Sequence, residues 1–337
     1  MSVHSGDTIN ILILVTPHFN LATTTGFIDP FRAANYIIGK NAFRWHLASL
    51  EGGTVQASSG ISVATEKLAD ILQPKPAIAV VSASWAPDAH QGRDMVATVL
   101  RLAQSGARVG GLDTGGFILA KAGLLKGKRA TVHYEHIDAF QELYPEVTVT
   151  ENLFEMGSNT FTCCGGLAST DLALHLLREV KGEGLANATA RYLFHHSVRG
   201  TGASQNPHLV EPYGQTTPGL VRKAIDLMEA HLEDPVPIPK LCSKLQVSQR
   251  HLGRVFKRYV GKTPVHYYRD IRLDRARGLV TQTEMKLSEI AVASGFTNQV
   301  HFSRSYRERF GLSPTQDRIE GRVPFEFRAW PMHSPQS

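Results

Sequence analysis

Cysteine is scarce in this sequence, which has only Cys163, Cys164 and Cys242 among 337 residues. An odd number of cysteines without C-x-x-C spacing argues against a disulfide framework and against a zinc site. Long hydrophobic runs are also missing, because the apolar run at residues 9–15 is far too short to span a bilayer. No basic segment precedes that run, as one would in a signal peptide. These absences predict a reduced, cytoplasmic protein without a membrane partner.

A surplus of either charge is missing from the first two thirds of the chain. Residues 1–217 hold 16 Lys and Arg against 18 Asp and Glu, whereas residues 218–320 hold 18 against 11. The net charge of +6 therefore comes from the C-terminal third. A basic excess confined to one region favours a module that contacts nucleic-acid phosphates. A chain of this length is also expected to hold two domains, each with its own core.

The C-terminal third contains one helical pattern twice. Around Gly295, a short amphipathic helix precedes the glycine, and Asn298 is a suitable N-cap for a second helix at 299–309. About fifty residues earlier, Leu241 and Leu245 indicate a first helix, and Ser248 is the expected N-cap of a second. A long amphipathic helix at 266–280 separates the two units. Two helix-turn-helix units on a rigid spacer can present two recognition helices to successive major grooves, ~34 Å apart on one face of DNA.

The second helix of each unit has an apolar stripe and a polar side. In the first unit the stripe is expected to comprise Leu252, Val255, Phe256 and Tyr259. One basic amphipathic helix would usually be only a solvated surface, so the prediction depends on the repetition. The polar sides predict the DNA contacts, which are Ser248, Gln249, Arg250, Arg254, Lys257, Asn298, Gln299, His301, Arg304 and Arg307.

Residues 220–318 resemble the DNA-binding domain of the AraC/XylS family of transcriptional regulators. The resemblance is carried by the double helix-turn-helix, by RLDRAR at 272–277, by EIAVASGF at 289–296 and by HFSRSYRERFG at 301–311. It implies a transcriptional regulator, more often an activator, whose partners are double-stranded DNA, a small-molecule inducer and RNA polymerase. It leaves a homodimer open.

The N-terminal half alternates expected strands and helices. This alternation predicts an α/β fold with a doubly wound, mostly parallel sheet covered on both faces, of flavodoxin-like type. It is followed by an all-α domain with two helix-turn-helix units. The strands are expected at 9–15, 43–50, 77–84, 107–113, 130–135, 146–152 and the start of 161–180, with helices at 25–39, 95–106, after residue 115 and at the end of 161–180.

A sharp turn is expected between the strand and the helix of residues 107–125. The segment Gly111-Leu112-Asp113-Thr114-Gly115 has the G-x-nucleophile-x-G spacing of a nucleophile elbow. Its glycines permit the turn, and the central side chain projects above the N-terminus of the following helix, where an anionic group is stabilised. The pattern therefore predicts that Asp113 is exposed.

With this elbow and with ATVHYE at 130–135, residues 9–180 resemble the PfpI-type branch of the class I glutamine amidotransferase-like superfamily. Fusion to an AraC-type domain resembles the GlxA-like group of regulators. The two resemblances place an amidotransferase-like sensor domain at 8–196 and a DNA-binding domain at 218–320. The Gly-, Ser-, Asn- and Pro-rich composition between them predicts a linker at 197–217, and a flexible tail is expected at 321–337.

The sequence departs from the enzymes of that superfamily at the elbow, where they carry a cysteine and this chain has Asp113. A carboxylate cannot replace a thiolate in attack on an amide, so we expect no catalytic residue and no enzyme. The alternative is a hydrolase-type enzyme in which Asp113 is the nucleophile and His133 is its base, because carboxylates do form covalent intermediates.

A non-catalytic cleft at the carboxyl ends of the strands can bind a ligand instead. The expected ligand-binding residues are His18, Asp29, Trp85, Asp113, Thr114 and His133, and the resemblance is what places Asp29 near the elbow. Trp85 as a cover for the core and His133 as a structural histidine stay open as alternatives. Carboxylates beside aromatic walls suit a cationic ligand.

The segment CGGLASTDLAL at 164–174 resembles regulators of arginine, carnitine and glycine-betaine catabolism, which implies an amino acid or a quaternary amine as the inducer. No cofactor is expected. No metal is expected either, because His195 and His196 are adjacent and lack the i,i+4 spacing of a helical metal site.

Overall fold

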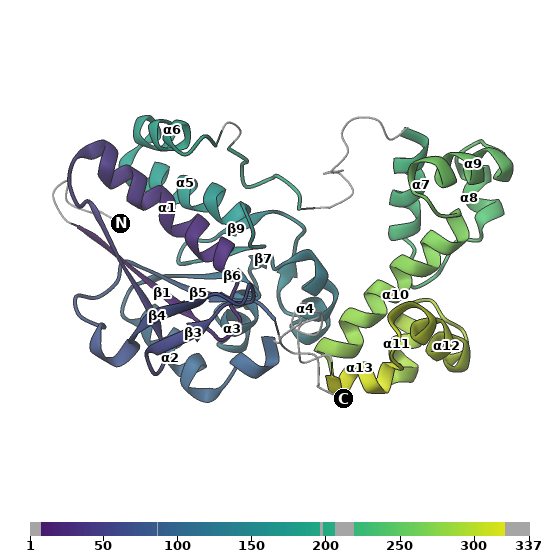
Figure 1. Cartoon of the computed structure of the whole chain (residues 1–337), viewed down its shortest axis with the longest axis horizontal. Helices are drawn as coiled ribbons and strands as arrows, with labels where there is room; N and C mark the ends of the chain where they lie inside the picture. Colours follow the sequence, from purple (N-terminus) through teal and green to yellow (C-terminus); the bar gives the residue numbers. More distant parts are fainter. Residues whose placement is uncertain (1–7, 86, 196–197, 206–218, 321–337) are drawn as a thin grey trace. The chain divides into compact units, whose positions relative to one another are not determined.

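The computed structural model describes residues 8–85, 87–195, 198–205 and 219–320. The chain forms two compact units, one that extends to Gln205 and one that starts at Asn206 (Figure 1). Much of the expected linker and the whole expected tail at 321–337 lie outside the described residues. The N-terminal unit is therefore longer than the expected limit at residue 196.

The N-terminal unit is built on an eight-stranded sheet that is mostly parallel. Its inner strands pair in parallel, and its two edge strands, β3 and β9, are antiparallel to their neighbours. The predicted doubly wound sheet is confirmed. Its strand order is β3 (Gly53–Gln56), β4 (Ser62–Lys67), β2 (Phe43–Ser49), β1 (Ile9–Val15), β5 (Ile78–Ala83), β6 (Arg108–Asp113), β10 (Thr160–Cys163) and β9 (Phe154–Met156).

Helices cover both faces of this sheet because its central strands are apolar on both sides. In β1, Ile11 and Ile13 pack into one core, whereas Leu12 and Leu14 pack into the other. The first core contains residues of α1 (Leu21–Ile38), α5 (Ala168–Lys181) and α6 (Glu183–Tyr192), which lie together in Figure 1. The second contains residues of α2 (Arg93–Gln104), α3 (Gly115–Lys121) and α4 (Ile137–Leu143).

Several boundaries differ from the prediction. Helix α1 starts at Leu21, four residues early, because the Asn20 side chain accepts a hydrogen bond from the Thr23 amide at 3.1 Å and caps it. The strand expected at 130–135 is wrong beyond Ala130. There the chain forms only β7 (Arg129–Ala130), paired with β8 (Thr148–Val149), and then a 3₁₀ helix, η3 (Tyr134–His136). The edge strands β3, β4 and β9 and the short helices α4, η1 (Leu68–Asp70) and η2 (Pro87–His90) were not predicted.

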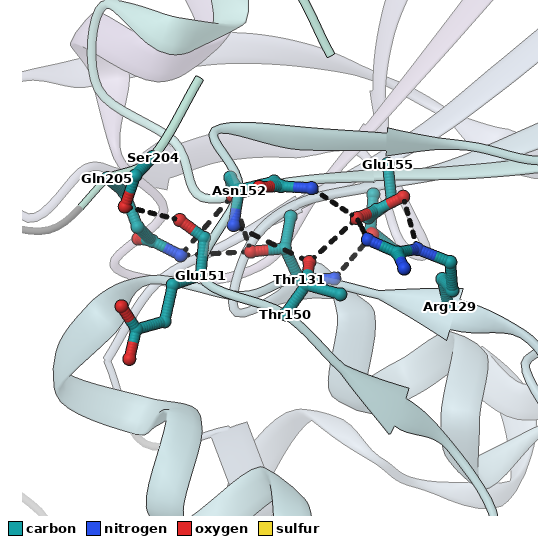
Figure 2. Close-up of polar contacts among 9 residues, drawn as sticks. Arg129, Thr131, Thr150, Glu151, Asn152, Glu155, Ser204 and Gln205 are labelled. Atoms are coloured by element: carbon teal, nitrogen blue, oxygen red, sulfur yellow. Dashed lines mark hydrogen bonds and ion pairs between the residues drawn. The ribbon is translucent and has the colours of Figure 1, made fainter. Parts of the chain in front are cut away.

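Backbone hydrogen bonds join the end of the N-terminal unit to its core. The Leu153 amide donates to the Ala203 carbonyl and the Gln205 amide donates to the Glu151 carbonyl, both at 2.7 Å. The Gln205 side chain also donates to the Thr131 hydroxyl at 2.9 Å, within the polar cluster of Figure 2. These contacts explain why residues up to 205 belong to this unit although their composition is typical of a linker.

The C-terminal unit is all helical, as predicted, and has two small cores joined by the long helix α10 (Figure 1). One core forms around Leu241, Leu252 and Phe256, and the other around Phe302 and Tyr306. Among the described residues, no helix is both long and apolar enough to cross a membrane. The helices are α7 (Gly219–Glu229), α8 (Ile238–Lys244), α9 (Gln249–Tyr259), α10 (Pro264–Gln282), α11 (Leu287–Ala293), α12 (Gln299–Phe310) and α13 (Pro314–Glu320).

Candidate DNA-binding surface and elbow site

Both expected recognition helices begin at the expected caps. The Ser248 side chain accepts from the His251 amide at 3.2 Å at the start of α9. The Asn298 side chain accepts from the amides of Val300 and His301, at 2.8 and 3.3 Å, at the start of α12. Each cap satisfies amides that a helix leaves without an internal partner. The turn before α12 is also as predicted, since Gly295 has φ +71°.

The apolar stripes of the two helices correspond at an interval of fifty residues. Leu252 and Phe256 in α9 are fully buried, and Phe302 and Tyr306 are buried at the same positions in α12. Tyr259 was predicted to be buried, but 42% of it is exposed and the Arg258 guanidinium lies 5.5 Å from the centre of its ring. The stripe prediction fails there because Tyr259 is the last residue of α9, beyond the core.

The ten side chains predicted to contact DNA are all exposed in the C-terminal unit. Two of them make local contacts at equivalent positions: Arg254 lies 3.2 Å from the His251 imidazole, and Arg304 donates to Glu308 at 3.1 Å. Arg309, near the end of α12, pairs with Asp274 of α10 at 2.6 Å. The two helices therefore present a basic, hydrogen-bonding surface of the kind that contacts base edges and phosphates.

A contact that sequence reasoning missed joins the two helix-turn-helix units. Arg272 of α10 donates to the carbonyls of Ser294 and Gly295, at 3.0 and 2.8 Å, and stacks on Phe296. A Cβ atom on Gly295 would lie 2.5 Å from the Leu232 carbonyl oxygen, in the connection between α7 and α8. The turn of the second unit thus packs directly on the first, and burial lowers the pKa of Arg272. No local pattern indicates this contact.

The second unit also contains a buried carboxylate. Asp317 of α13 is fully buried and accepts from Arg277 and from the Tyr306 hydroxyl, both at 2.8 Å. Burial is the largest of the effects that raise the pKa of Tyr306. These bonds connect α13, α10 and α12, so they fix the back of the recognition helix.

In the N-terminal unit, the predicted elbow is formed. Asp113 ends β6 with φ +59°, and α3 begins two residues later. A Cβ atom on Gly111 would lie 2.6 Å from the Gly115 carbonyl carbon, and one on Gly115 would lie 2.3 Å from the Val81 carbonyl oxygen. Only glycine fits this strand–turn–helix at those two positions.

The prediction that Asp113 is exposed is wrong, since only 3% of the residue is accessible. Gly165 covers it, and a Cβ atom at that position would lie 2.9 Å from the Asp113 Cβ. Asn20 covers it from the other direction, because its Nδ2 atom donates to the Asp113 Oδ2 at 3.2 Å. The elbow directs the side chain out of its own turn, but two other segments of the chain close over it.

Burial raises the pKa of Asp113 to about 6, against the opposing influence of His133 and of hydrogen bonds from Asn20 and Ser84. Among the residues that the structure describes, no Lys or Arg forms an ion pair with this carboxylate. Asp113 therefore combines full burial with incomplete charge compensation, which is typical of groups at functional sites.

The other expected ligand-binding residues have different surroundings. Thr114 is fully buried and donates to the Ser84 carbonyl. His18 and Trp85 are half-buried at the ends of β1 and β5, where burial lowers the pKa of His18. Asp29 does not lie at the elbow: it is exposed, pairs with Arg32 at 2.7 Å, and lies about 13 Å along α1 from Asn20. The residue of this segment that contacts Asp113 is Asn20, and its only local signal is that an Asn before a helix is a suitable cap.

His133 lies close enough to Asp113 to lower the pKa of the carboxyl group. It is part of a group that sequence reasoning did not identify, in which donor atoms of His133, Glu135 and His136 all lie within 4.8 Å of one another. The H-x-E-H spacing is the signal that could have revealed it. Of the described residues, these three are the ones that could hold a metal ion.

The Cys163 thiol near the elbow is a poor nucleophile. Cys163 and Cys164 are buried, and burial raises the pKa of the Cys163 thiol well above its ordinary value. A buried thiol that stays protonated does not attack a substrate.

Comparison with known proteins connects both units to transcription. Residues 10–179 match the DJ-1/PfpI family, and residues 241–319 match the helix-turn-helix domain family. The chain is 38% identical to the HTH-type transcriptional regulator CdhR of Pseudomonas aeruginosa, over 90% of each chain. It is 31% identical to the HTH-type transcriptional regulator GlxA of Rhizobium meliloti, over 89% of this chain and 93% of that one. A ThiJ/PfpI family protein from Pseudomonas syringae has a similar fold, with a TM-score of 0.52 and 15% identity over 71% of this chain and 86% of that one.

Proposed function

Because this chain belongs to the AraC-type helix-turn-helix transcriptional regulators that carry a DJ-1/PfpI domain, we propose that α9 and α12 bind the two halves of one operator and that a small metabolite bound by the N-terminal unit controls transcription from it. DNA binding follows from the family. The two-part operator, the metabolite, activation through RNA polymerase and a homodimer are proposals.

The DNA-binding proposal is based on the matching caps, buried residues and exposed arginines of α9 and α12. Both helices are capped, both bury two apolar residues at the same positions, and both expose an Arg six residues after the cap, Arg254 or Arg304. Equivalent surfaces on one unit are suited to half-sites about 10 base pairs apart. We expect DNA selected from a random library by the full chain to contain two such half-sites.

Alanine variants at the two equivalent arginines test this arrangement. Arg304→Ala should weaken operator binding by about 1–3 kcal/mol and relax preference in one half-site, and Arg254→Ala should do the same in the other. Quantitative gel-shift assays with cognate and random DNA separate the two roles of an arginine. Equal loss on both DNAs would identify Arg304 as a phosphate contact and overturn its assignment to a base.

The metabolite proposal is supported by the buried elbow carboxylate. Asp113 is covered by Asn20 and Gly165 and, within the described residues, has no Lys or Arg partner. A cationic amine would supply that partner, and the desolvated carboxylate would favour it over a neutral molecule of the same shape. This favours an amino acid or a quaternary amine as the ligand class.

A matched pair of compounds tests the charge requirement. Glycine betaine and 3,3-dimethylbutanoate have the same shape and differ in the cationic nitrogen, so they can be compared by thermal shift alongside L-arginine and L-carnitine. A ligand at 100 times its Kd stabilises the native state by about 2.7 kcal/mol. The ligand that stabilises the wild type should lose about ten- to hundredfold in potency with Asp113→Asn. An unchanged midpoint would remove Asp113 from the site.

An enzyme that uses Asp113 as a nucleophile has less support. Burial raises the pKa of Asp113 to about 6, so part of the carboxyl group is protonated at mildly acidic pH, and a protonated carboxyl group is not a nucleophile. Detection by mass spectrometry of an adduct on Asp113 after incubation with activated esters would favour the enzyme instead.

A further inference from the structure

The segment after β7 brings three potential metal ligands together through one turn of 3₁₀ helix. The His136 amide donates to the His133 carbonyl at 2.8 Å, which is the i to i+3 bond of that helix type. In a 3₁₀ helix residues three apart lie on the same side, so the two imidazoles are neighbours, with ring centroids 6.0 Å apart and ring planes at 64° to each other. The Glu135 Oε2 atom lies 3.9 Å from the His133 Nδ1 atom.

The surroundings hold one ligand firmly and leave the others accessible. His136 is 5% exposed and packs edge-to-face on Phe117, with 6.2 Å between the ring centroids. The His133 side chain is 31% exposed and the Glu135 side chain is 49% exposed. A buried inner ligand beside two partly exposed outer ones allows an ion to enter from solvent and bind all three side chains.

The donor types indicate which ion would bind. Two imidazole nitrogens and one carboxylate oxygen suit Zn²⁺ and similar divalent transition metals, whereas Mg²⁺ and Ca²⁺ prefer oxygen ligands throughout. Donors on a tetrahedral zinc lie roughly 3.3 Å apart, given bonds of about 2 Å. The donor atoms here lie within 4.8 Å of one another, so modest rotation of the exposed side chains would complete the geometry.

We propose that His133, Glu135 and His136 bind one divalent transition-metal ion, of which Zn²⁺ is the representative, with the remaining coordination positions open to water or to a ligand. The ion would lie on the side of the elbow from which His133 and Glu135 act electrostatically on Asp113. Its charge would then partly compensate the buried carboxylate. The inference does not require that the N-terminal unit bind an organic metabolite.

The test is a titration of the full chain, without a histidine tag and freed of metal by dialysis against a chelator. Zn²⁺ binding is followed by isothermal titration calorimetry, and Co²⁺ is used as a visible-absorption probe of its ligands. Loss of a residue that only hydrogen-bonds to a metal ligand typically lowers metal affinity 10- to 100-fold. Loss of a direct ligand in His133→Ala or Glu135→Gln should therefore lower Zn²⁺ affinity by at least about 100-fold.

The chain contains a matched control in the pair of His46 and Glu66. These side chains lie 2.8 Å apart and are 30% and 49% exposed, almost the same as His133 and Glu135, but they belong to no group of three donors among the described residues. His46→Ala should leave Zn²⁺ stoichiometry and affinity unchanged. His136→Ala is a less direct test because His136 is buried on Phe117, so the two exposed ligands decide the outcome.

Two results overturn the proposal. One is a wild type that binds no Zn²⁺, or binds it only as weakly as the His133→Ala variant. The other is an affinity that falls equally in His46→Ala, which would indicate adventitious binding to surface histidines. The proposal is supported if the wild type binds one equivalent of Zn²⁺ and the His46→Ala control keeps it. His133→Ala and Glu135→Gln should both lose this equivalent together with the Co²⁺ absorption. The metal titration decides this proposal whether or not the wild type binds amines.

Discussion

Each unit of this protein buries an aspartate, and the two carboxylates differ in their partners. Asp317 in the C-terminal unit is fully buried and accepts from Arg277 and Tyr306. Asp113 in the N-terminal unit is 3% exposed and accepts from the neutral side chain of Asn20. A buried charge is tolerated when it is paired and hydrogen-bonded. The fold therefore accounts for the first carboxylate, whereas the second is the group that the proposed cationic ligand would neutralise.

Another buried carboxylate in the N-terminal unit does have a cationic partner. Asp171 of α5 is fully buried and lies 2.8 Å from the His195 Nε2 atom and 2.6 Å from the Arg199 guanidinium. These contacts join the end of the unit to α5. The incomplete compensation at the elbow is thus specific to Asp113, which sharpens its contrast with Asp317.

The largest effect is expected when the C-terminal carboxylate is removed. Asp317→Ala should cost about 3–5 kcal/mol, because it leaves the Arg277 charge and the buried Tyr306 hydroxyl without their acceptor. Hydrogen–deuterium exchange on the full chain should show lost protection in α12 and α13 but not in β1. Asp274→Ala is the control, since its ion pair with Arg309 is half-exposed and should contribute only about 0–1 kcal/mol. Equal losses in the two variants would contradict the structural role of Asp317.

Removing the charge of Asp113 should stabilise the protein, whereas removing Asp317 should destabilise it. The folded-state pKa of about 6 lies above the ordinary value of 3.8, so the folded protein binds more protons than the unfolded chain between those values. The stability that this group contributes is full below pH 3.8 and is lost as the pH rises through 6. At about 1.4 kcal/mol per pH unit, the ionised carboxylate costs up to ~3 kcal/mol at pH 7.5.

Asp113→Asn should therefore stabilise the protein at pH 7.5 by up to about 3 kcal/mol and change it little at pH 4. Asn also tolerates the positive φ at this position. Urea unfolding of wild type and variant from pH 4 to 8 measures the difference, with His133, Glu135 and Cys163 as the titratable neighbours that act on the same site. Parallel stability profiles would show that the native carboxylate is compensated after all, and the contrast with Asp317 would disappear.

The cover over the elbow can be tested at two adjacent glycines. Gly165 and Gly166 both have positive φ, but only a Cβ atom at 165 would collide with Asp113. Gly166→Ala should cost about 1–2 kcal/mol for its left-handed backbone. Gly165→Ala should cost about as much again, because Asp113 must also move. If displacement uncovers the carboxylate, its pKa falls toward 3.8, and the pH dependence described above becomes weaker in Gly165→Ala alone. The same pH dependence in both variants would mean that Gly165 is not the cover.

Local chemistry explains which features of the two units could be predicted. The caps Ser248 and Asn298 and the elbow turn at Asp113 depend on residues within five positions of each other, so the sequence pattern indicates them directly. Their exposure depends on distant segments. Gly165, some fifty residues further along the chain, closes over Asp113, and Asp274 of α10 pairs with Arg309 of α12. Periodicity and spacing contain no information about such partners.

The same limit applies to the proposed ligand site. Asp29 and Asn20 both belong to the α1 segment, and the family resemblance favoured the acidic residue over the amide. Only the cap geometry, in which Asn20 holds both the start of α1 and the Asp113 carboxylate, identifies the residue that lies at the elbow. In the C-terminal unit the family resemblance and the residue chemistry indicate the same residues. All ten side chains that were predicted to contact DNA are exposed there.

The smallest change in stability is expected when the exposed carboxylate of Asp29 is replaced. It is exposed on α1 and pairs with Arg32 in an i,i+3 arrangement, which contributes roughly 0.2–0.5 kcal/mol on a helix surface. Asp29→Asn should therefore change stability by no more than that at any pH between 4 and 8, and should leave the response to amines as in the wild type. A thermal-shift titration beside Asp113→Asn gives the comparison directly. If Asp29→Asn weakened amine binding as much as Asp113→Asn does, the ligand would extend along α1, and burial would not be what distinguishes the functional carboxylate.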